Sequence, residues 1–412
     1  MNLLRFTTAG SVDDGKSTLI GRLLYDSKSV FIDQMEAVEK TSLRKGLERI
    51  DFSLLTDGLK DEREQGITID VAYRYFATPA RKFIIADTPG HIQYTRNMVT
   101  GASTADAALI LVDARHGVVE QTRRHSFLAG LLGIPNVMVC INKMDLVDFD
   151  QEAYDRIVVD YARVKAGAGL RHVAFLPISA LLGDNVVDPS PNMPWYQGPT
   201  LLHHLETLEV ERPEGAGDFR FPVQTVIRPH SDTHHDFRGY AGRVASGKIA
   251  LGDAVTAYPS GLTSAVASIV LGDMQLEEAH TGQSVVITLA DDVDISRGDT
   301  LATGASPRME QQPLATLCWL DNSPQRPGAK YVLRHGSAEA RAMLANVEGV
   351  LDVEALTFEA ATQPLTANSI ARVQLKTTKP LVMDAYTQNR ITGSFILVDE
   401  TSGATVAAGM LS

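Results

Sequence analysis

Residues 10–18 constrain the fold of this chain more than any other stretch. They read Gly-Ser-Val-Asp-Asp-Gly-Lys-Ser-Thr and fit the pattern G-x-x-x-x-G-K-[ST], which is typical of loops that wrap nucleotide phosphates. A strand is predicted before the loop over residues 3–9, and a helix after it over residues 17–25. The phosphates would then lie at a helix N-terminus, where backbone N–H groups favour anions. An ordinary glycine-rich turn is the alternative, but strand, loop and helix in this order favour the phosphate loop.

The positions of this loop have distinct predicted roles. Gly10 and Gly15 allow backbone torsions and a close approach that a Cβ would block. Lys16 directs a positive charge toward the β- and γ-phosphates and is predicted to act in catalysis, while the Ser17 hydroxyl is placed to bind Mg²⁺. The predicted nucleotide-binding residues of the loop are Gly10, Ser11, Val12, Asp13, Asp14, Gly15, Lys16, Ser17 and Thr18.

Residues 1–210 alternate between predicted strands and helices. The strands are predicted from continuous apolar runs at residues 82–86, 107–112, 136–141 and 172–178. The runs end at Asp87, Asp113, Asn142 and Ser179. Such runs are typical of strands buried on both faces, and helical patterns lie between them. We therefore predict an α/β domain with a mostly parallel sheet, helices on both faces, and a ligand at the carboxyl ends of the strands.

The rest of the chain reads as two further domains rich in β-strands. A charged, glycine-containing linker occupies residues 209–218, and short strands split by turn signals follow it. This spacing predicts a small antiparallel β-barrel over residues 219–304 and a second one over residues 311–412. Neither barrel carries a nucleophile–base pair or a metal-ligand pattern. Contact with a partner is their expected role, and structural support is the alternative.

A second group of polar residues follows the strand predicted at residues 82–86. It consists of Asp87, Thr88, Pro89, Gly90 and His91. Asp87 is predicted to hold Mg²⁺ through water. Gly90 is predicted to present its N–H group to the γ-phosphate and to move when that phosphate leaves.

Thr68 lies upstream in a charged stretch and is predicted to complete the Mg²⁺ shell only when the γ-phosphate is present. A threonine at such a position is, taken alone, an ordinary β-branched strand residue. The phosphate loop and the Asp-Thr-Pro-Gly turn favour the switch role.

The identity of the base is predicted from Asn142, Lys143 and Asp145. An ionised Asp145 accepts two hydrogen bonds from guanine, whereas adenine lacks both donors and would leave a carboxylate unpaired. Lys143 is expected to lie along the base and ribose, and Asn142 to brace neighbouring loops. Backbone contacts to the guanine oxygen are expected from Ser179, Ala180 and Leu181. The predicted ligands are therefore GTP or GDP with Mg²⁺.

The composition of the chain indicates its compartment and the kinds of partner to expect. The chain has 412 residues, 44% of them apolar, and a formal net charge of −12, which argues against a broad nucleic-acid surface. No apolar run is long enough to cross a membrane, and the N-terminus lacks a signal-peptide layout. Cys140 and Cys318 are far apart and read as buried thiols of a reducing compartment. We expect a cytoplasmic protein that contacts neither membrane nor nucleic acid.

These motifs together resemble the GTPases of the translation-factor class, and a GTPase domain followed by two barrels resembles elongation factor Tu. The closer resemblance is to the large, GTP-hydrolysing subunit of bacterial sulfate adenylyltransferase. The stretches that carry it are residues 10–18, 61–76, 93–103, 236–247 and 380–393. In the translation-factor class the histidine after Asp-x-Pro-Gly orients the attacking water, which implies that role for His91. Two positions depart from the patterns: Asp14 replaces the usual histidine of translation factors, and Ile92 replaces the glutamate expected in the sulfate family.

The resemblance implies a two-chain mechanism. A smaller catalytic subunit would bind ATP and sulfate and form adenylyl sulfate and pyrophosphate, driven by GTP hydrolysis on the present chain in a heterodimer or higher heteromer. A translational GTPase that carries aminoacyl-tRNA is the alternative, although shared architecture alone gives it weak support. A GTPase chaperone or regulator with another partner also remains open.

Overall fold

The computed structural model describes residues 2–28, 38, 42, 50, 52–55, 70–210, 217–229 and 237–412. The chain forms two compact units. The first comprises Met1–Val210 with Asp352–Thr357, and the second comprises Glu211–Leu351 with Phe358–Ser412. Within the described ranges, no helix is long and apolar enough to span a bilayer. The division into three domains at the predicted boundaries stays a prediction.

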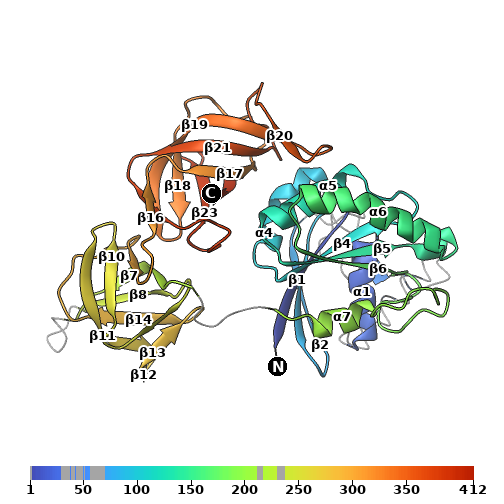
Figure 1. Cartoon of the computed structure of the whole chain (residues 1–412), viewed down its shortest axis with the longest axis horizontal. Coiled ribbons are helices and arrows are strands. Elements are labelled where there is room, and N and C mark those ends of the chain that lie inside the picture. Colours follow the sequence, from blue (N-terminus) through green and yellow to red (C-terminus); the bar gives the residue numbers. More distant parts are fainter. Residues whose placement is uncertain are drawn as a thin grey trace. The chain divides into compact units, whose positions relative to one another are not determined.

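The first unit is built on one mixed sheet (Figure 1). Its described strands follow the order β2-β3-β1-β4-β5-β6. Their bounds are β1 Leu3–Ala9, β2 Ala72–Ala77, β3 Lys82–Asp87, β4 Ala107–Asp113, β5 Asn136–Asn142 and β6 His172–Pro177. All neighbouring pairs are parallel except β2–β3, which is antiparallel. The predicted α/β fold with a mostly parallel sheet is confirmed.

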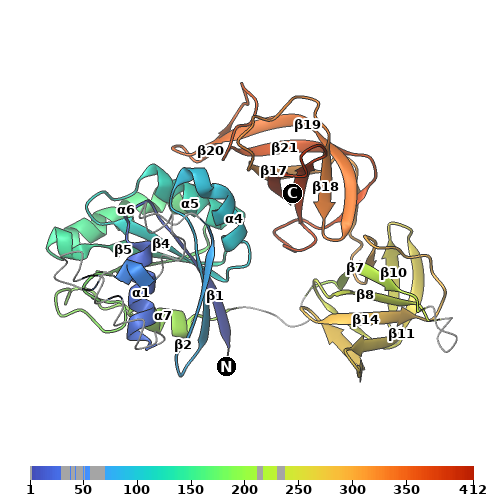
Figure 2. The ribbon, with the colours of Figure 1, turned by 180° about the vertical axis from the view of Figure 1, so that it is seen from behind.

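Helices cover both faces of this sheet, as the opposite views in Figures 1 and 2 show. Their bounds are α1 Lys16–Asp26, α4 Thr95–Ala102, α5 Glu120–Leu131, α6 Gln151–Gly167 and α7 Leu201–Thr207. Short 3₁₀ helices are η1 Phe52–Leu55, η2 Ile92–Tyr94 and η3 Met144–Val147. The longest of the described helices, α6, begins where the Asp150 carboxylate accepts hydrogen bonds from the N–H groups of Glu152 and Ala153, a side-chain N-cap.

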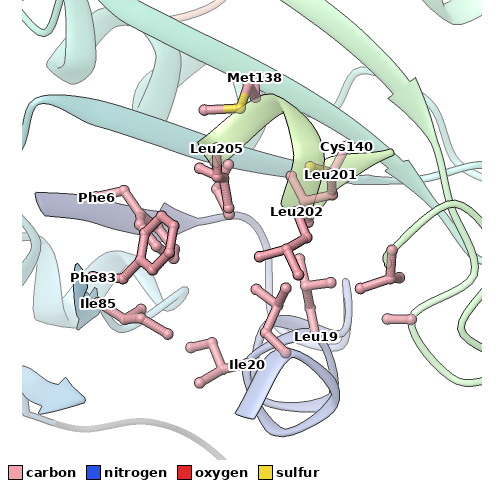
Figure 3. Packing of buried hydrophobic residues seen from close by; sticks show 14 of the residues in the cluster. Phe6, Leu19, Ile20, Phe83, Ile85, Met138, Cys140, Leu201, Leu202 and Leu205 are labelled. Atoms are coloured by element: carbon pink, nitrogen blue, oxygen red, sulfur yellow. The ribbon is translucent and has the colours of Figure 1, made fainter. Parts of the chain in front are cut away.

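The core explains why the predicted runs are continuous. Every residue of β4 is buried, because apolar side chains leave both faces of that strand. On one face, leucines of α1 and α7 pack in one cluster with residues of β1, β3 and β5, among them the neighbouring rings of Phe6 and Phe83 (Figure 3). On the other face lie α4, α5 and α6.

Parallel pairing places the polar residues that end the strands along one edge. Thr8 of β1 lies opposite Asp87 of β3, and Asp113 of β4 lies opposite Asn142 of β5. The loops after β1, β3, β4, β5 and β6 therefore meet at the carboxyl edge, where ligands of such sheets bind.

The second unit contains two closed antiparallel barrels. In the first, the described strands follow the order β10-β15-β7-β8-β14-β11, and pairing of β10 with β11 closes the ring. The bounds are β7 Arg220–Ile227, β8 Gly239–Arg243, β9 Lys248–Ala250, β10 Ala254–Tyr258, β11 Leu262–Leu271, β12 Met274–Leu276, β13 Glu278–His280, β14 Ser284–Leu289 and β15 Thr300–Ala302. Closure leaves this ring of strands without unpaired edges.

The second barrel closes in the same way. Its described strands follow the order β18-β23-β24-β17-β21-β19, and β18 pairs with β19. The bounds are β16 Arg308–Glu310, β17 Leu314–Trp319, β18 Tyr331–His335, β19 Ala338–Asp352, β20 Thr357–Glu359, β21 Ile370–Thr377, β22 Leu381–Met383, β23 Ser394–Asp399 and β24 Thr405–Leu411. The predicted pair of small antiparallel barrels is confirmed.

A buried ion pair joins the two barrels. Arg220 at the start of β7 is 4% exposed, and its Nε lies 3.0 Å from Oδ2 of Asp384, which follows β22. Its other guanidinium nitrogens donate to backbone oxygens, including Ala305 O at 2.7 Å. The Thr392 hydroxyl donates to Asp384 Oδ2 at 2.6 Å. Both charges are thus hydrogen-bonded on several sides, as burial of an ion pair requires.

We expect Asp384→Ala to lower the free energy of unfolding of the second unit by about 3 kcal/mol, because the buried Arg220 guanidinium loses its directly hydrogen-bonded carboxylate and keeps the more distant Asp218, at 3.9 Å. Unfolding of the full chain is followed by the fluorescence of buried Trp319, with Trp195 changed to Phe so that Trp319 alone reports. The control is Glu278→Ala, which removes an exposed partner of Lys248 and should change stability little. Equal stability of the two variants would contradict the structural role of Asp384.

Candidate functional site

The loop between β1 and α1 folds around the ammonium group of Lys16. Lys16 Nζ donates to the carbonyl oxygens of Gly10 at 3.0 Å and Ser11 at 2.8 Å, and its side chain is buried. Burial lowers the pKa of this ammonium group, and the nearby carboxylates of Asp14 and Asp87 oppose that shift. A positive charge thus lies at the N-terminus of α1, beside the backbone N–H groups of its first turn, which suits a phosphate.

Asn142 links this loop to two others. Its Nδ2 donates to Asp14 O at 2.7 Å, and its Oδ1 accepts from Ala180 N at 2.9 Å. Gly15 has a left-handed backbone (φ 92°), and a Cβ there would lie 2.5 Å from Asn142 Nδ2. Only glycine therefore allows the phosphate loop to approach the end of β5 this closely.

Asp14, the departure from the translation-factor pattern, faces its own loop. Its Oδ2 accepts a 2.6 Å hydrogen bond from Ser11 N. Burial raises the pKa of the Asp14 carboxyl, and the Lys16 ammonium group opposes the rise. The side chain thus holds the loop closed, a role beyond the nucleotide contact that was predicted for this position.

The turn after β3 lies directly against the phosphate loop. The Thr8 hydroxyl donates to Asp87 Oδ1 at 3.2 Å, and the Thr88 hydroxyl donates to Thr8 O. A Cβ on Gly90 would lie 2.3 Å from Lys16 Nζ and 2.5 Å from Gly10 O. The backbone of Gly90 therefore lies against Lys16 and the phosphate loop, although contact of its N–H group with a terminal phosphate stays a prediction.

Ser17 and the buried Asp87 are the described residues that could hold Mg²⁺. Both offer oxygen, the donor that Mg²⁺ prefers, and the Thr8 hydrogen bond fixes the orientation of the carboxylate. In the described part of the chain no group of three or more His, Cys, Asp or Glu side chains gathers. Mg²⁺ is commonly held by one or two protein ligands together with substrate phosphates, and binding of Mg²⁺ by Ser17 and Asp87 stays a prediction.

His91 is half-buried at the start of the segment that leads into η2. Its Nδ1 accepts a 3.3 Å hydrogen bond from Gln93 N, and its ring lies edge-on to Tyr94 at 6.2 Å. An Nδ1 that accepts leaves the ring proton on Nε2, so the neutral ring presents an N–H donor there. Thr68, which was predicted to form the switch together with Gly90, lies outside the described residues.

The predicted base-recognition residues come together around Ser179. The Ser179 hydroxyl donates to Asp145 Oδ1 at 2.6 Å and accepts from Leu182 N at 3.2 Å. Lys143 has a left-handed backbone (φ 64°), and its Nζ lies 2.9 Å from Asp113 Oδ2. The structure thus brings together the loops that carry Asn142, Lys143, Asp145 and residues 179–181, although their contact with a base stays a prediction.

Two residues of this edge were not assigned a role from the sequence. Asp113 ends β4 and binds Lys143. Arg22, on α1, donates from Nη2 to Leu181 O at 2.6 Å and from Nε to Ala180 O at 3.3 Å, so it holds the loop after β6. The position of Asp113 at a strand end was a usable signal, whereas nothing in the local sequence distinguishes Arg22 from an ordinary helix-surface arginine.

Comparison with known proteins gives matches along the whole chain. The family model described as elongation factor Tu GTP binding domain matches residues 1–283, and the one described as GTP-eEF1A C-terminal domain-like matches residues 312–412. The bifunctional enzyme CysN/CysC of Mycobacterium tuberculosis is 54% identical over 99% of this chain and 67% of its own length. Sulfate adenylyltransferase subunit 1 of Cellvibrio japonicus is 52% identical over 99% of this chain and 86% of its own length. The protein of the same name from Shewanella oneidensis is 52% identical over 99% of this chain and 85% of its own length.

Proposed function

The chain belongs to the family of sulfate adenylyltransferase subunit 1 proteins, within the elongation factor Tu class of GTPases, and from that premise we propose that it is the GTP-hydrolysing subunit of a sulfate adenylyltransferase. The observation that carries the proposal is the match at 52% identity to nearly the full length of a subunit 1 protein. A chain named as one subunit implies another, so the active form is a complex with a smaller catalytic subunit that binds ATP and sulfate.

The reaction of that partner needs a source of free energy. A sulfate oxygen attacks the α-phosphorus of ATP, the bond to the β-phosphate bridging oxygen breaks, and pyrophosphate leaves. The mixed anhydride so formed is uphill from ATP and sulfate. Hydrolysis of GTP on the present chain supplies the missing free energy when the two reactions are coupled.

The residues of the carboxyl edge have different roles in the binding and hydrolysis of GTP. The N–H groups of the phosphate loop and Lys16 bind the β- and γ-phosphates, and Ser17 and Asp87 would hold Mg²⁺, which would neutralise charge on the phosphate oxygens. His91 donates from Nε2 to the attacking water and keeps it in line with the leaving oxygen. The Asp145 carboxylate, held by the Ser179 hydroxyl, selects guanine.

We propose that the turn after β3 couples GTP hydrolysis on this chain to the reaction on the partner subunit. Gly90 lies against Lys16, so contact of its N–H group with the γ-phosphate favours one arrangement of the turn, and loss of that phosphate removes the contact. Thr68 would be a further ligand of Mg²⁺ when the γ-phosphate is present. The partner subunit would distinguish the two arrangements.

The experiment uses the full chain purified together with its partner subunit. Pyrophosphate release from ATP is measured with and without sulfate, and with GTP, a non-hydrolysable GTP analogue, or no guanine nucleotide. We expect sulfate-dependent release that rises with GTP and not with the analogue. The control complex carries Lys16→Ala and should behave as if GTP were absent. Sulfate-dependent release that is unchanged when GTP is withheld would contradict the coupling. A complex that hydrolyses GTP but binds aminoacyl-tRNA tightly and salt-sensitively, without sulfate-dependent release, would favour the translational carrier.

A further inference from the structure

We propose that Asp113 is a positioning residue for guanine recognition, because its carboxylate fixes the side chain of Lys143 beside the base site before the nucleotide binds. The inference rests on the proposed function as a GTP-binding subunit and adds a residue to it. No motif of the nucleotide site includes Asp113.

The pairing of β4 with β5 brings the two residues together. Asp113, the last residue of β4, lies opposite Asn142, the last residue of β5, and Lys143 follows directly. Lys143 then adopts a left-handed conformation (φ 64°, ψ 34°), which is unfavourable for a residue with a Cβ. The turn reverses the chain into η3, and the Lys143 ammonium group reaches Asp113 Oδ2 at 2.9 Å.

The carboxylate that receives Lys143 is itself fixed in position. Arg115 donates to Asp113 Oδ1 from both its backbone N and its Nε, each at 3.0 Å, and to Oδ2 from Nη2 at 2.6 Å. This is a two-pronged arginine–carboxylate pair, which fixes the plane of the acceptor. Burial alone would raise the pKa of Asp113, but the hydrogen bonds from Arg115 and Lys143 lower it well below its usual range. Asp113 is therefore charged at neutral pH.

The Lys143 side chain stays partly exposed although its ammonium group is bound. The Asp113 side chain is 2% exposed, whereas the Lys143 side chain, whose ammonium group binds Asp113, is 22% exposed and so remains partly accessible to a ligand. Asp145, two residues after Lys143, lies on η3, and its carboxylate accepts a hydrogen bond from the Ser179 hydroxyl. A lysine stem held at its tip offers a flat apolar surface to a purine ring, while Asp145 binds the ring edge.

Holding Lys143 in place beforehand is expected to reduce the side-chain entropy that is lost when the nucleotide binds. A free lysine side chain samples many rotamers, and arranging it along a base would reduce affinity. When Asp113 holds the ammonium group beforehand, less freedom is lost on binding. Removing Asp113 should therefore weaken GDP and GTP by the same factor, about tenfold, because the base is common to both.

The test is a double-mutant cycle on the full chain with a fluorescent GDP analogue and with GTP. We expect Asp113→Ala to weaken both ligands about tenfold, and to have no further effect when Lys143 is already Ala. Asp113→Asn serves as an isosteric second variant, so the cycle remains measurable if the alanine variant does not fold. The control is His116→Ala, whose exposed ring lies 3.7 Å from the same carboxylate without touching Lys143, and which should bind as the wild type does.

The outcomes separate this inference from the proposed function. A loss on removal of Asp113 that is the same with Lys143 present or absent would show a general structural role and overturn the inference alone. Unchanged affinity of both Asp113 variants for GDP and GTP would also overturn this inference alone. A wild-type chain that bound no guanine nucleotide would overturn the proposed function and this inference together.

Discussion

Replacing His91 by alanine should remove GTP hydrolysis by the chain and leave GTP binding close to that of the wild type. The His91 ring accepts from Gln93 N at Nδ1, so its Nε2–H group is a donor suited to hold a water molecule rather than to take its proton. In-line placement of that water is the main task of such a residue, and its loss should slow hydrolysis about 10²–10⁴-fold. Binding survives because Lys16, the phosphate loop and Asp145 hold the nucleotide.

The measurement is phosphate release in a single turnover, with GTP affinity determined on the same preparation. A suitable control is His172→Ala, since His172 is exposed at the start of β6, at the amino edge of the sheet. His172→Ala should hydrolyse GTP at the wild-type rate. A His91→Ala chain with wild-type turnover would remove His91 from the mechanism, whatever its affinity for GTP.

The first unit was predictable because its signals are local. Strands β3, β4 and β5 are continuous apolar runs that end in a polar residue, and the phosphate loop fits a pattern confined to residues 10–18. Strand β2 was not predicted. Its exposed Tyr73 and Tyr75 alternate with other residues at a sheet edge, so no apolar run marks it.

Other features depend on residues that are far apart in sequence. The barrels were predicted from short strands and turns, but the pairings that close them, β10 with β11 and β18 with β19, are set by registers that only the folded chain defines. The Arg220–Asp384 pair joins positions 164 residues apart. Asp113 was predicted to end a strand. Its proposed role in positioning Lys143 also requires the left-handed turn at Lys143, which no local sequence pattern predicts.

Asp145→Asn should shift the preference of the chain from GTP toward xanthosine triphosphate. In its proposed role the Asp145 carboxylate would accept from the ring N–H and amino groups of guanine, and an amide would place a donor against one of them. Xanthine carries a carbonyl oxygen where guanine has its amino group, so the same amide would find an acceptor there. A site that loses a buried donor–acceptor match of this kind discriminates by about 10³–10⁴-fold. Affinities for both nucleotides, measured by competition with a fluorescent analogue, give the shift directly.

The structure offers a matched control three residues along the chain. Asp148 is exposed, with a left-handed backbone (φ 53°) that asparagine tolerates well, so Asp148→Asn makes the same chemical change at the other end of η3. That variant should keep the wild-type preference for GTP. Ser179 can still donate to the amide oxygen of an asparagine at position 145, so the Asp145 variant keeps the contact that orients the side chain, and only the face toward the base changes. An Asp145→Asn chain that still preferred GTP would therefore count against base recognition by Asp145, and not merely against the stability of its loop.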